Sequence, residues 1–458
     1  MSDPRKTAPL AAVILAAGKG TRMKSALPKV LHRVAGRPLI GHVLAAARAL
    51  DCARIGVVVA PGLPEVAAAV APSMVVVQER QLGTGHAVLA ARDFLADFDG
   101  DVMVLYGDTP LLRAETLARL VARHAGGAVP AIVVLGMRPV DPGEYGRLVA
   151  GAGDSLETIV EYRDATAAQR AIGLCNSGVL VADRALLFDL LSEVTNANAK
   201  GEYYLTEIVG LARKRGLSCA YVEAPAGELL GVNSRADLAA AEAAAQDRLR
   251  TQAMAGGATL IDPRSIYFSY DTRLGRDVTV GPNVVFGTGV VVGDGVEIRA
   301  YCHIEGTRIE TGATIGPFAR LRAGTVVGQG ARIGNFVEVK NSILAQGAAA
   351  SHLSYLGDAS IGVGTNIGAG TITCNYDGVV KSRTEIGAGA FIGSNTALVA
   401  PVKIGDGAII GAGSVVTRDV PADSLTLSRA PQVDRPGAAA RYREQAKKGA
   451  GDKGRKKE

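Results

Sequence analysis

The chain has 458 residues, enough for two or three domains, and its 48% of hydrophobic residues can build sizeable cores. Trp is absent and aromatic residues make up only 4%, so those cores must be mainly aliphatic. The net charge is +6, but residues 441–458 hold eight basic and three acidic side chains and therefore account for +5 of it. The rest of the chain is close to neutral, which argues against a body that binds nucleic acid.

Cysteines and apolar runs narrow the class of protein further. Five cysteines are scattered without a Cys-x-x-Cys pair, which favours reduced thiols in a cytoplasmic protein over a disulfide framework or a zinc site. No run of about twenty apolar residues predicts a transmembrane helix, so we expect no membrane insertion. The apolar run at 8–17 leads into Gly-Lys-Gly-Thr-Arg, which suits a strand and a phosphate loop better than a signal peptide.

The first predicted element is a strand at 11–15 that runs directly into the Gly-rich segment 16–23. Such a turn brings backbone N–H groups close to phosphate oxygens. The segment is not a P-loop, because no Gly-Lys-Ser/Thr closes it, and not a dinucleotide fingerprint, because Met23 stands where the third Gly belongs. The cations Lys19, Arg22 and Lys29 suit a triphosphate; a purely structural Gly turn is the alternative.

Further strands are predicted at 55–60, 75–77, 102–106 and 131–135. They alternate with helical stretches, which favours an α/β fold with a mostly parallel sheet. Ligands of such sheets lie beyond the carboxyl ends of the strands. Asp108 follows one of these strands. It can hold Mg²⁺ there or, with Thr109-Pro110 after it, cap a helix.

A helix is predicted after Ser234, which forms a capping box with Asp237. Its apolar residues recur at helical spacing until Gly256-Gly257 ends the run. We interpret this helix as a rigid strut between two globular units.

From about residue 274 to 421 an apolar, almost always aliphatic, residue returns at every sixth position, and the phase slips by one residue between Ile304 and Ile309. A period of six fits neither a helix nor a single strand, but it is typical of a parallel β-helix with one short strand per side. The residues that lead the repeats are Leu274, Val280, Phe286, Val292, Ile298, Ile304, Ile309, Ile315, Leu321, Val327, Ile333, Val339, Ile361, Ile367, Ile386, Ile392, Leu398, Ile404, Ile410 and Val416. A parallel β-helix of this kind has three flat sides and is called a prism below. It can be an enzyme or only a scaffold for assembly.

The hexapeptide pattern breaks between Val339 and Ile361 and again between Ile367 and Ile386, and each break is expected to leave the stack as an outer loop. His352 lies in the first break. A lone histidine is more often structural, but polar residues cluster around both breaks. Histidine can also serve as a general base, so a catalytic role is the alternative to a structural one.

Short motifs carry a resemblance to a known family. Residues 15–23 with Pro28-Lys29 resemble the opening signature of the sugar-nucleotide pyrophosphorylases. The motifs that follow in the expected order are Gln81-Leu82-Gly83-Thr84-Gly85-His86, Tyr106-Gly107-Asp108, Tyr145-Gly146-Arg147, Ile159-Val160-Glu161, Asn176-Ser177-Gly178 and Gly231-Val232-Asn233. Joined to a hexapeptide β-helix, they resemble the bacterial bifunctional N-acetylglucosamine-1-phosphate uridylyltransferases and glucosamine-1-phosphate N-acetyltransferases over roughly residues 11–429.

The resemblance implies an α/β, Rossmann-like nucleotidyltransferase domain followed by a left-handed parallel β-helix. It implies that Arg22 and Lys29 act in catalysis and that Asp108 and Asn233 bind Mg²⁺. The residues implied to bind the UDP-sugar are Leu15, Ala16, Ala17, Gly18, Lys29, Gln78, Gly83, Thr84, Tyr106, Gly107, Asp108, Gly146, Glu161, Asn176 and Asn233.

For the prism, the resemblance implies that His352 is the general base of acetyl transfer. The residues implied to bind the amino-sugar phosphate are Arg322, Lys340, Tyr355 and Asn366. Those implied to bind acetyl-CoA are Ala369, Asn375, Tyr376, Ser394, Ala412 and Arg429. Ala323 departs from the family pattern, which has Pro at this turn.

The sequence thus predicts four segments: a uridylyltransferase domain at 1–235, a helical linker at 236–256, a β-helix acetyltransferase domain at 257–440 and a basic, disordered tail at 441–458. The flat sides of a prism favour a homotrimer. The expected small molecules are UTP, acetyl-CoA, glucosamine 1-phosphate and N-acetylglucosamine 1-phosphate, and no nucleic acid is expected to bind. Two alternatives remain: a nucleotidyltransferase on an inert scaffold, and a regulatory subunit with an inactive nucleotide fold.

Overall fold

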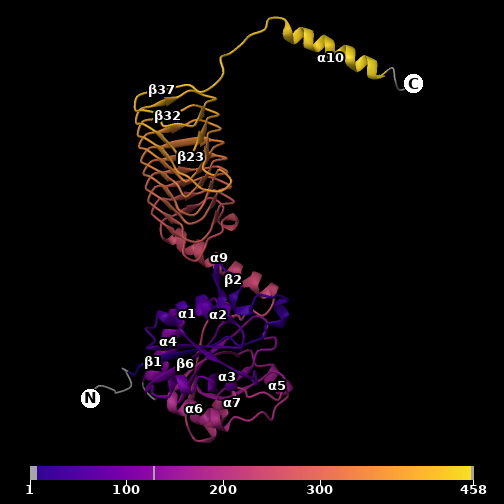
Figure 1. The fold of residues 1–458 in the computed structure, drawn as a ribbon. Coiled ribbons are helices and arrows are strands. Elements are labelled where there is room, and N and C mark those ends of the chain that lie inside the picture. The colour runs from indigo at the N-terminus through magenta and orange to yellow at the C-terminus, as the bar shows by residue number, and fades with distance from the viewer. Residues whose placement is uncertain (1–7, 127–128, 455–458) are drawn as a thin grey trace. The chain divides into compact units, whose positions relative to one another are not determined.

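The structure is a computed structural model that describes residues 8–126 and 129–454 (Figure 1). The chain divides into two compact units, Met1–Thr272 with Val285–Gly289 and Arg273–Val284 with Val290–Glu458. The first unit therefore includes the helix for which we predicted a separate linker.

A twisted sheet forms the centre of the first unit, with strand order β11-β7-β10-β6-β1-β4-β5. All neighbours on this path are parallel except β10, which runs antiparallel to β6 and β7. The strands of this unit are β1 (Leu10–Leu15), β2 (Arg33–Val34), β3 (Arg37–Pro38), β4 (Arg54–Val59), β5 (Met74–Val77), β6 (Asp101–Tyr106), β7 (Ile132–Met137), β8 (Arg147–Ala150), β9 (Leu156–Val160), β10 (Cys175–Asp183), β11 (Cys219–Glu223), β12 (Thr259–Leu260) and β15 (Val285–Phe286). The predicted mostly parallel sheet is confirmed.

Both faces of this sheet are buried, because alternate residues of each strand point to opposite sides. Val13 of β1 belongs to one apolar cluster and the neighbouring Ile14 to the other. The helices of this unit are α1 (Leu39–Arg48), α2 (Pro64–Val70), α3 (Thr84–Leu89), α4 (Ala114–Ala125), α5 (Ala167–Arg170), α6 (Arg184–Glu193), α7 (Glu207–Lys214), α8 (Ala226–Leu229) and α9 (Arg235–Ala255), with single turns of 3₁₀-helix at η2 (Thr21–Met23), η3 (Lys29–Leu31), η4 (Asp93–Leu95) and η5 (Pro263–Ser265).

Helix α9 is not a free strut. Ser234 and Asp237 form the predicted capping box, but Ala241 and Ala245 are buried in the same apolar cluster as Met23 and Val34. Small alanine side chains let the helix approach the rest of the first unit closely. The interpretation of α9 as a strut was therefore wrong.

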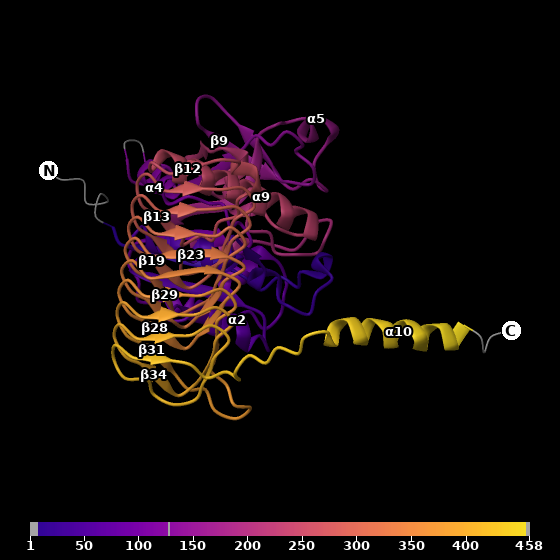
Figure 2. The ribbon, with the colours of Figure 1, turned by 90° about the horizontal axis from the view of Figure 1, so that it is seen from above.

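The second unit is a left-handed parallel β-helix, whose coils stack along one axis (Figures 1 and 2). Along one side run β14 (Thr279–Val280), β17 (Glu297–Ile298), β20 (Thr314–Ile315), β23 (Arg332–Asn335), β26 (Ala349–His352), β29 (Asn366–Ile367), β32 (Phe391–Ile392), β35 (Ile409–Ile410) and β37 (Leu425–Thr426). Along the next run β18 (His303–Ile304), β21 (Arg320–Leu321), β24 (Glu338–Lys340), β27 (Tyr355–Gly357), β30 (Ile372–Cys374), β33 (Ala397–Val399) and β36 (Val415–Val416).

The third side, prominent in Figure 2, consists of β13 (Arg273–Leu274), β16 (Val291–Val292), β19 (Thr307–Ile309), β22 (Thr325–Val327), β25 (Ile343–Leu344), β28 (Ala359–Ile361), β31 (Thr384–Ile386) and β34 (Val402–Ile404). Residues that lead the repeats fill the interior; Ile298, Ile315 and Ile333 are at most 1% exposed. The predicted β-helix is confirmed.

The first of the two predicted breaks does not leave the stack. Between Val339 and Ile361 the chain forms β25, β26, β27 and β28, and Leu344, Ala350 and Leu356 fill the interior positions. The sequence pattern does not reveal this coil, because Val339 to Leu344 and Leu356 to Ile361 are steps of five residues rather than six, and because the small Ala350 takes an interior position. At the second break the buried Thr373 takes an interior position, and residues 375–383 follow as a loop between β30 and β31.

The C-terminal segment differs from the expected disordered tail. It forms α10 (Ala438–Gly454), in which the stretch from Ala439 to Lys448 is exposed; residues 455–458 lie outside the described part of the chain. Ala, Arg, Glu, Gln and Lys predominate in that stretch, and all are strong helix formers, which explains a helix without a packing partner there. In the described part of the chain no helix is both long and apolar enough to cross a membrane.

Candidate functional sites

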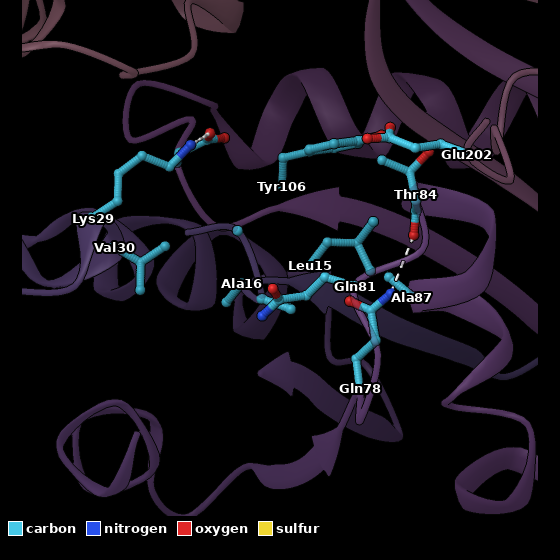
Figure 3. A pocket seen from close by; sticks show the side chains of 14 residues that line it. Leu15, Ala16, Lys29, Val30, Gln78, Gln81, Thr84, Ala87, Tyr106 and Glu202 are labelled. Atoms are coloured by element: carbon cyan, nitrogen blue, oxygen red, sulfur yellow. Dashed lines mark hydrogen bonds and ion pairs between the residues drawn. The ribbon is translucent and has the colours of Figure 1, made fainter. Parts of the chain in front are cut away.

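A cavity of about 300 Å³ opens at the carboxyl ends of β1, β5 and β6, where the sequence placed the nucleotide (Figure 3). Lys29 and Gln78 lie at opposite ends of it. Its lining consists of Leu15, Ala16, Ala17, Gly18, Lys29, Val30, Gln78, Gln81, Gly83, Thr84, Ala87, Tyr106, Asp108 and Glu202. Ten of these are predicted UDP-sugar residues, so the structure brings most of that set together.

Three polar side chains meet at the Lys29 end of the cavity. The Lys29 ammonium pairs with the Asp108 carboxylate and donates a 3.1 Å hydrogen bond to Asn233 Oδ1. Helix α4 begins at Ala114 with Arg113 as its N-cap, so the alternative role of Asp108 as a helix cap is wrong. The Asp108 carboxylate and the Asn233 amide oxygen instead both face the Lys29 ammonium.

The donor set at this end fits Mg²⁺. One carboxylate and one amide oxygen, completed by water and phosphate oxygens, are ordinary ligands of this ion. Asp108 and Asn233 already face a common cation in the form of the Lys29 ammonium. Arg22 lies elsewhere: it is exposed on η2 and is not part of the cavity lining.

Gln78 is held in place at the other end of the cavity. Its side chain is 3% exposed, and its Nε2 lies 3.2 Å from the Gly83 carbonyl oxygen and 3.0 Å from His86 Nδ1. Gly83 has φ of +118°, and a Cβ there would stand 2.6 Å from the Tyr203 carbonyl oxygen. Only glycine fits so close to the backbone of another segment. The Thr84 hydroxyl accepts from the backbone N–H of Leu205 at 3.0 Å, which ties the same two segments together.

Gly146, Glu161 and Asn176, which are predicted to bind the UDP-sugar, form a second group. The Asn176 N–H donates to the Gly146 carbonyl at 2.8 Å, and the Thr206 hydroxyl donates to Glu161 Oε1 at 3.0 Å. Burial raises the pKa of the Glu161 carboxyl, and the Thr206 hydrogen bond opposes that rise. Burial also raises the pKa of the neighbouring Tyr106. Gly107, Gly146, Glu161, Asn176 and Asn233 do not line the main cavity; Glu161 lines a smaller one beside Tyr162 and Lys200.

One corner of the prism aligns His352 with predicted acetyl-CoA residues. His352 ends β26, and its backbone is in register with Asn335 of β23. On the following coils the equivalent positions, two residues past β29, β32 and β35, are Ala369, Ser394 and Ala412. We call Asn335, His352, Ala369, Ser394 and Ala412 the His352 corner. Arg429 reaches the same column, because its Nη1 donates to the Ala412 carbonyl at 2.6 Å.

A second corner gathers charged and amide groups at the carboxyl ends of β24, β27 and β30. Lys340 Nζ lies 3.3 Å from Asp358 Oδ2, and both Asn341 and Asn375 donate to the same carboxylate. Burial alone would raise the pKa of Asp358, but these hydrogen bonds outweigh it and hold the pKa below its usual range. Arg322, in line with Lys340, is paired with Glu338 at 2.9 Å.

The remaining predicted prism residues occupy other positions. Tyr355 begins β27, Asn366 begins β29, and Tyr376 is 57% exposed on the loop that follows β30. We call Lys340, Asn341, Asp358 and Asn375 the Asp358 group. Among the described residues, no hydrogen bond or ion pair joins the His352 corner to this group. The two groups lie at different corners of the prism, because β26 and β27 belong to two different sides.

Several residues of both sites were missed at the sequence level. Glu202 and Thr206 lie in the stretch 201–206, whose density of polar and aromatic residues between two helices was the available signal. Asn335 and Asp358 were missed because their partners lie one coil away. A period of about seventeen residues, rather than six, would have aligned them.

Comparisons with known proteins cover both units. Residues 12–184 match the MobA-like NTP transferase domain, and residues 271–306, 306–341 and 383–418 match the bacterial transferase hexapeptide (six repeats). The matched repeats leave out 342–382, the stretch that holds His352.

Full-length relatives are similar along nearly the whole chain. The chain is 57% identical over 436 residues to the "Bifunctional protein GlmU" of Paramagnetospirillum magneticum, covering 95% of this chain and 97% of that protein. It is 62% identical over 433 residues to the protein of the same name from Rhodospirillum rubrum, with 94% and 97% covered.

Proposed function

This chain belongs to the GlmU family of bifunctional proteins and is an enzyme with two transferase activities; on that premise we propose that it makes UDP-N-acetylglucosamine in two steps. The prism transfers acetyl from acetyl-CoA to glucosamine 1-phosphate. The first unit then joins N-acetylglucosamine 1-phosphate to the uridylyl group of UTP and releases pyrophosphate. The proposal rests on one observation: a single chain contains both sites. Its first unit has a cavity with Lys29 at one end, and its prism aligns a histidine with small side chains along one corner.

The uridylyl step requires no general base. The phosphate of the sugar substrate is already an anionic nucleophile near neutral pH, and it attacks the α-phosphorus of UTP while the bond to pyrophosphate breaks. Catalysis then consists of positioning the reactants and compensating negative charge. Lys29, at the cavity wall, and the backbone N–H groups near Gly18 supply this compensation, and the exposed Arg22 would have to move toward the triphosphate.

Asp108 and Asn233 would hold Mg²⁺, which when bound neutralises charge on the triphosphate oxygens. Gln78 faces the uracil, held by the Gly83 carbonyl and His86. Glu161 and Asn176 receive the sugar, and the Thr206 hydroxyl keeps the Glu161 carboxylate oriented.

The acetyl step needs a base, because the amine of glucosamine 1-phosphate is an ammonium ion near neutral pH. His352 Nε2 takes one proton from it, and the nitrogen lone pair attacks the thioester carbonyl. The C–S bond then breaks, and the CoA thiolate leaves and takes up a proton. Lys340 and Arg322 would bind the sugar phosphate, whereas the small side chains of Ala369, Ser394 and Ala412 leave room for the pantetheine arm along the His352 corner.

We propose a homotrimer, assembled through the prism. Tyr301, Phe318, Phe336 and Leu353 form an apolar stripe beside the His352 corner, each between 45% and 61% exposed. Consecutive rings of its three aromatic residues stack at 4.9 and 5.1 Å between centroids. An ordered apolar stripe of this kind is typical of a contact surface. Packing of a second copy against it would bring that copy's Arg322 and Asp358 group toward His352 and complete the site.

The expected location is the cytoplasm, which agrees with five cysteines that are all free thiols. The expected partners are small molecules and further copies of the chain.

Two substitutions test the proposal. His352→Ala should abolish release of free thiol from acetyl-CoA and glucosamine 1-phosphate but leave pyrophosphate release from UTP and N-acetylglucosamine 1-phosphate intact. Asp108→Ala should do the reverse. Thr251→Val, on the exposed face of α9, is the control and should preserve both activities. No thiol release by the unaltered protein would support the alternative of a nucleotidyltransferase on a scaffold, and loss of both activities in either folded variant would refute two independent sites.

A further inference from the structure

His352 has a partner on the preceding coil that neither the motifs nor the comparisons single out. Strands β23 and β26 are parallel neighbours, with Asn335 directly in register with His352. The Leu353 N–H donates to the Asn335 carbonyl at 3.0 Å, and His352 Nδ1 lies 2.6 Å from Asn335 Oδ1. The amide and the imidazole are therefore joined by backbone and by side chain.

The close approach of the two coils has a local cause. A Cβ on Gly334 would stand 1.9 Å from the Ser351 carbonyl oxygen, so only glycine allows the backbones to come this near. The Ser354 hydroxyl donates to the His352 carbonyl at 2.8 Å and fixes the backbone on the other side. The position of the His352 ring relative to Asn335 is thus set by the fold on both sides of the histidine.

An amide oxygen is only an acceptor, and this decides the tautomer of its partner. With Asn335 Oδ1 at 2.6 Å, the neutral imidazole carries its hydrogen on Nδ1 and leaves the lone pair on Nε2. The free lone pair is the one that a general base requires. An amide also adds no negative charge beside the ring, whereas a carboxylate in its place would favour the imidazolium.

We propose that Asn335 is a positioning residue for acetyl transfer: it holds His352 in the tautomer that can accept the ammonium proton. The inference rests on the acetyl-transfer function proposed above. Strands β23 and β29 pack against β26. The only charged residue on these two strands is Arg332 of β23, which is in register with Ala349, at the other end of β26 from His352. Strand β29 consists of Asn366 and Ile367 and carries no charge. The titratable group next along the chain is Tyr355 of β27.

Two variants separate positioning from a merely structural role. Asn335→Ala should lower kcat for acetyl transfer by about tenfold to a hundredfold, a share of what a general base contributes, with KM for glucosamine 1-phosphate nearly unchanged. Asn335→Asp keeps the acceptor and adds charge. It should restore kcat at high pH and move the acidic limb of the pH–rate profile up by about one pH unit. The matched control is Gln346→Ala, which removes an amide from a prism position outside the His352 corner and the Asp358 group. Pyrophosphate release should be unaffected in all three variants.

A spectroscopic measurement decides the point without activity. Solid-state ¹⁵N spectra of the full chain labelled at histidine, with the His352 signal assigned by difference from His352→Gln, should show hydrogen on Nδ1. Hydrogen on Nε2, or wild-type kcat and pH profile in both Asn335 variants, would overturn the inference. If the unaltered protein released no thiol, the proposed acetyl transfer would fail, while the tautomer would still decide the role of Asn335.

Discussion

Lys29 and Asn233 are separated by 204 positions in the chain, yet the Lys29 ammonium donates a 3.1 Å hydrogen bond to the Asn233 amide oxygen. The same ammonium pairs with Asp108, so a lysine occupies the space between the two oxygens that we assign to Mg²⁺. An ammonium and a metal ion cannot both hold those oxygens. If Mg²⁺ binds there as we propose, Lys29 must turn away, and its charge is then free for the triphosphate.

The first prediction concerns this competition. Lys29→Met removes the competing charge and should tighten binding of Mn²⁺, used as a probe without nucleotide, by about tenfold or more, or roughly 1.4 kcal/mol. The same change should lower kcat of uridylyl transfer, because the compensating cation is lost. Electron paramagnetic resonance of free Mn²⁺ measures the affinity. Lys29→Arg keeps the charge and should bind Mn²⁺ about as the unaltered protein does; weaker binding by Lys29→Met would contradict the competition.

The second prediction concerns the acid limit of uridylyl transfer. Burial raises the pKa of Glu161, and the hydrogen bond from Thr206 opposes it. If ionised Glu161 binds the sugar, kcat/KM for N-acetylglucosamine 1-phosphate falls as the pH drops through that pKa. Thr206→Val removes the hydrogen bond, raises the pKa further and should move the fall to higher pH by about one pH unit.

The pH profile of pyrophosphate release measures this shift. Thr251→Val, which removes a hydroxyl from an exposed position on α9, should leave the profile where it is. An unchanged acidic limb in a folded Thr206→Val variant would exclude Glu161 as the group that sets it.

The third prediction tests the contact between the Gly83 turn and Tyr203. Alanine at position 83 combines an unfavourable φ of +118° with a Cβ 2.6 Å from a carbonyl oxygen, so the segment with Glu202 and Thr206 must move. We expect Gly83→Ala to raise KM for UTP by about tenfold and to destabilise the first unit by at least about 2 kcal/mol. Steady-state kinetics and urea unfolding measure the two effects.

Gly227→Ala is the matched control, because a Cβ built there meets no atom within 4 Å outside its chain neighbours and the backbone of its own helix α8. Its KM and stability should match those of the unaltered protein. A Gly83→Ala variant with normal KM for UTP would show that residues 202–206 do not depend on this contact.

How far the sequence predicted the molecule depends on the range of each interaction. The strand before Gly18 and the sixfold repeat are local patterns, and both folds followed from them. The coil through Leu344, Ala350 and Leu356 was missed, because steps of five and a small lead residue conceal the period.

The site shows the same dependence. Motifs located most of the nucleotide cavity, since its residues lie at strand ends. Asp358 and Asn335 could not be found in this way, because each acts through a side chain one coil away. The packing of α9 against Met23 and Val34 was also not predicted, because these residues lie far from the helix in the sequence.

The last prediction concerns the apolar stripe. Phe318 and Phe336 both have φ of +56°, a backbone conformation that aspartate tolerates better than a bulky aromatic residue. The double substitution Phe318→Asp with Phe336→Asp should therefore leave each prism folded while placing charges in the proposed contact. We expect sedimentation velocity to show monomers, with acetyl transfer reduced at least about a hundredfold and uridylyl transfer retained.

The separation of the two activities follows from where each site is completed. The nucleotide cavity is formed by side chains of the first unit alone. In one prism the His352 corner and the Asp358 group lie on different sides, and we propose that a second copy brings them together. Ile343→Asp changes an exposed apolar residue on another side of the prism and should preserve the trimer. If the double variant remained trimeric, the stripe would not be the contact; if it became monomeric and still transferred acetyl at the normal rate, one chain would hold the complete site.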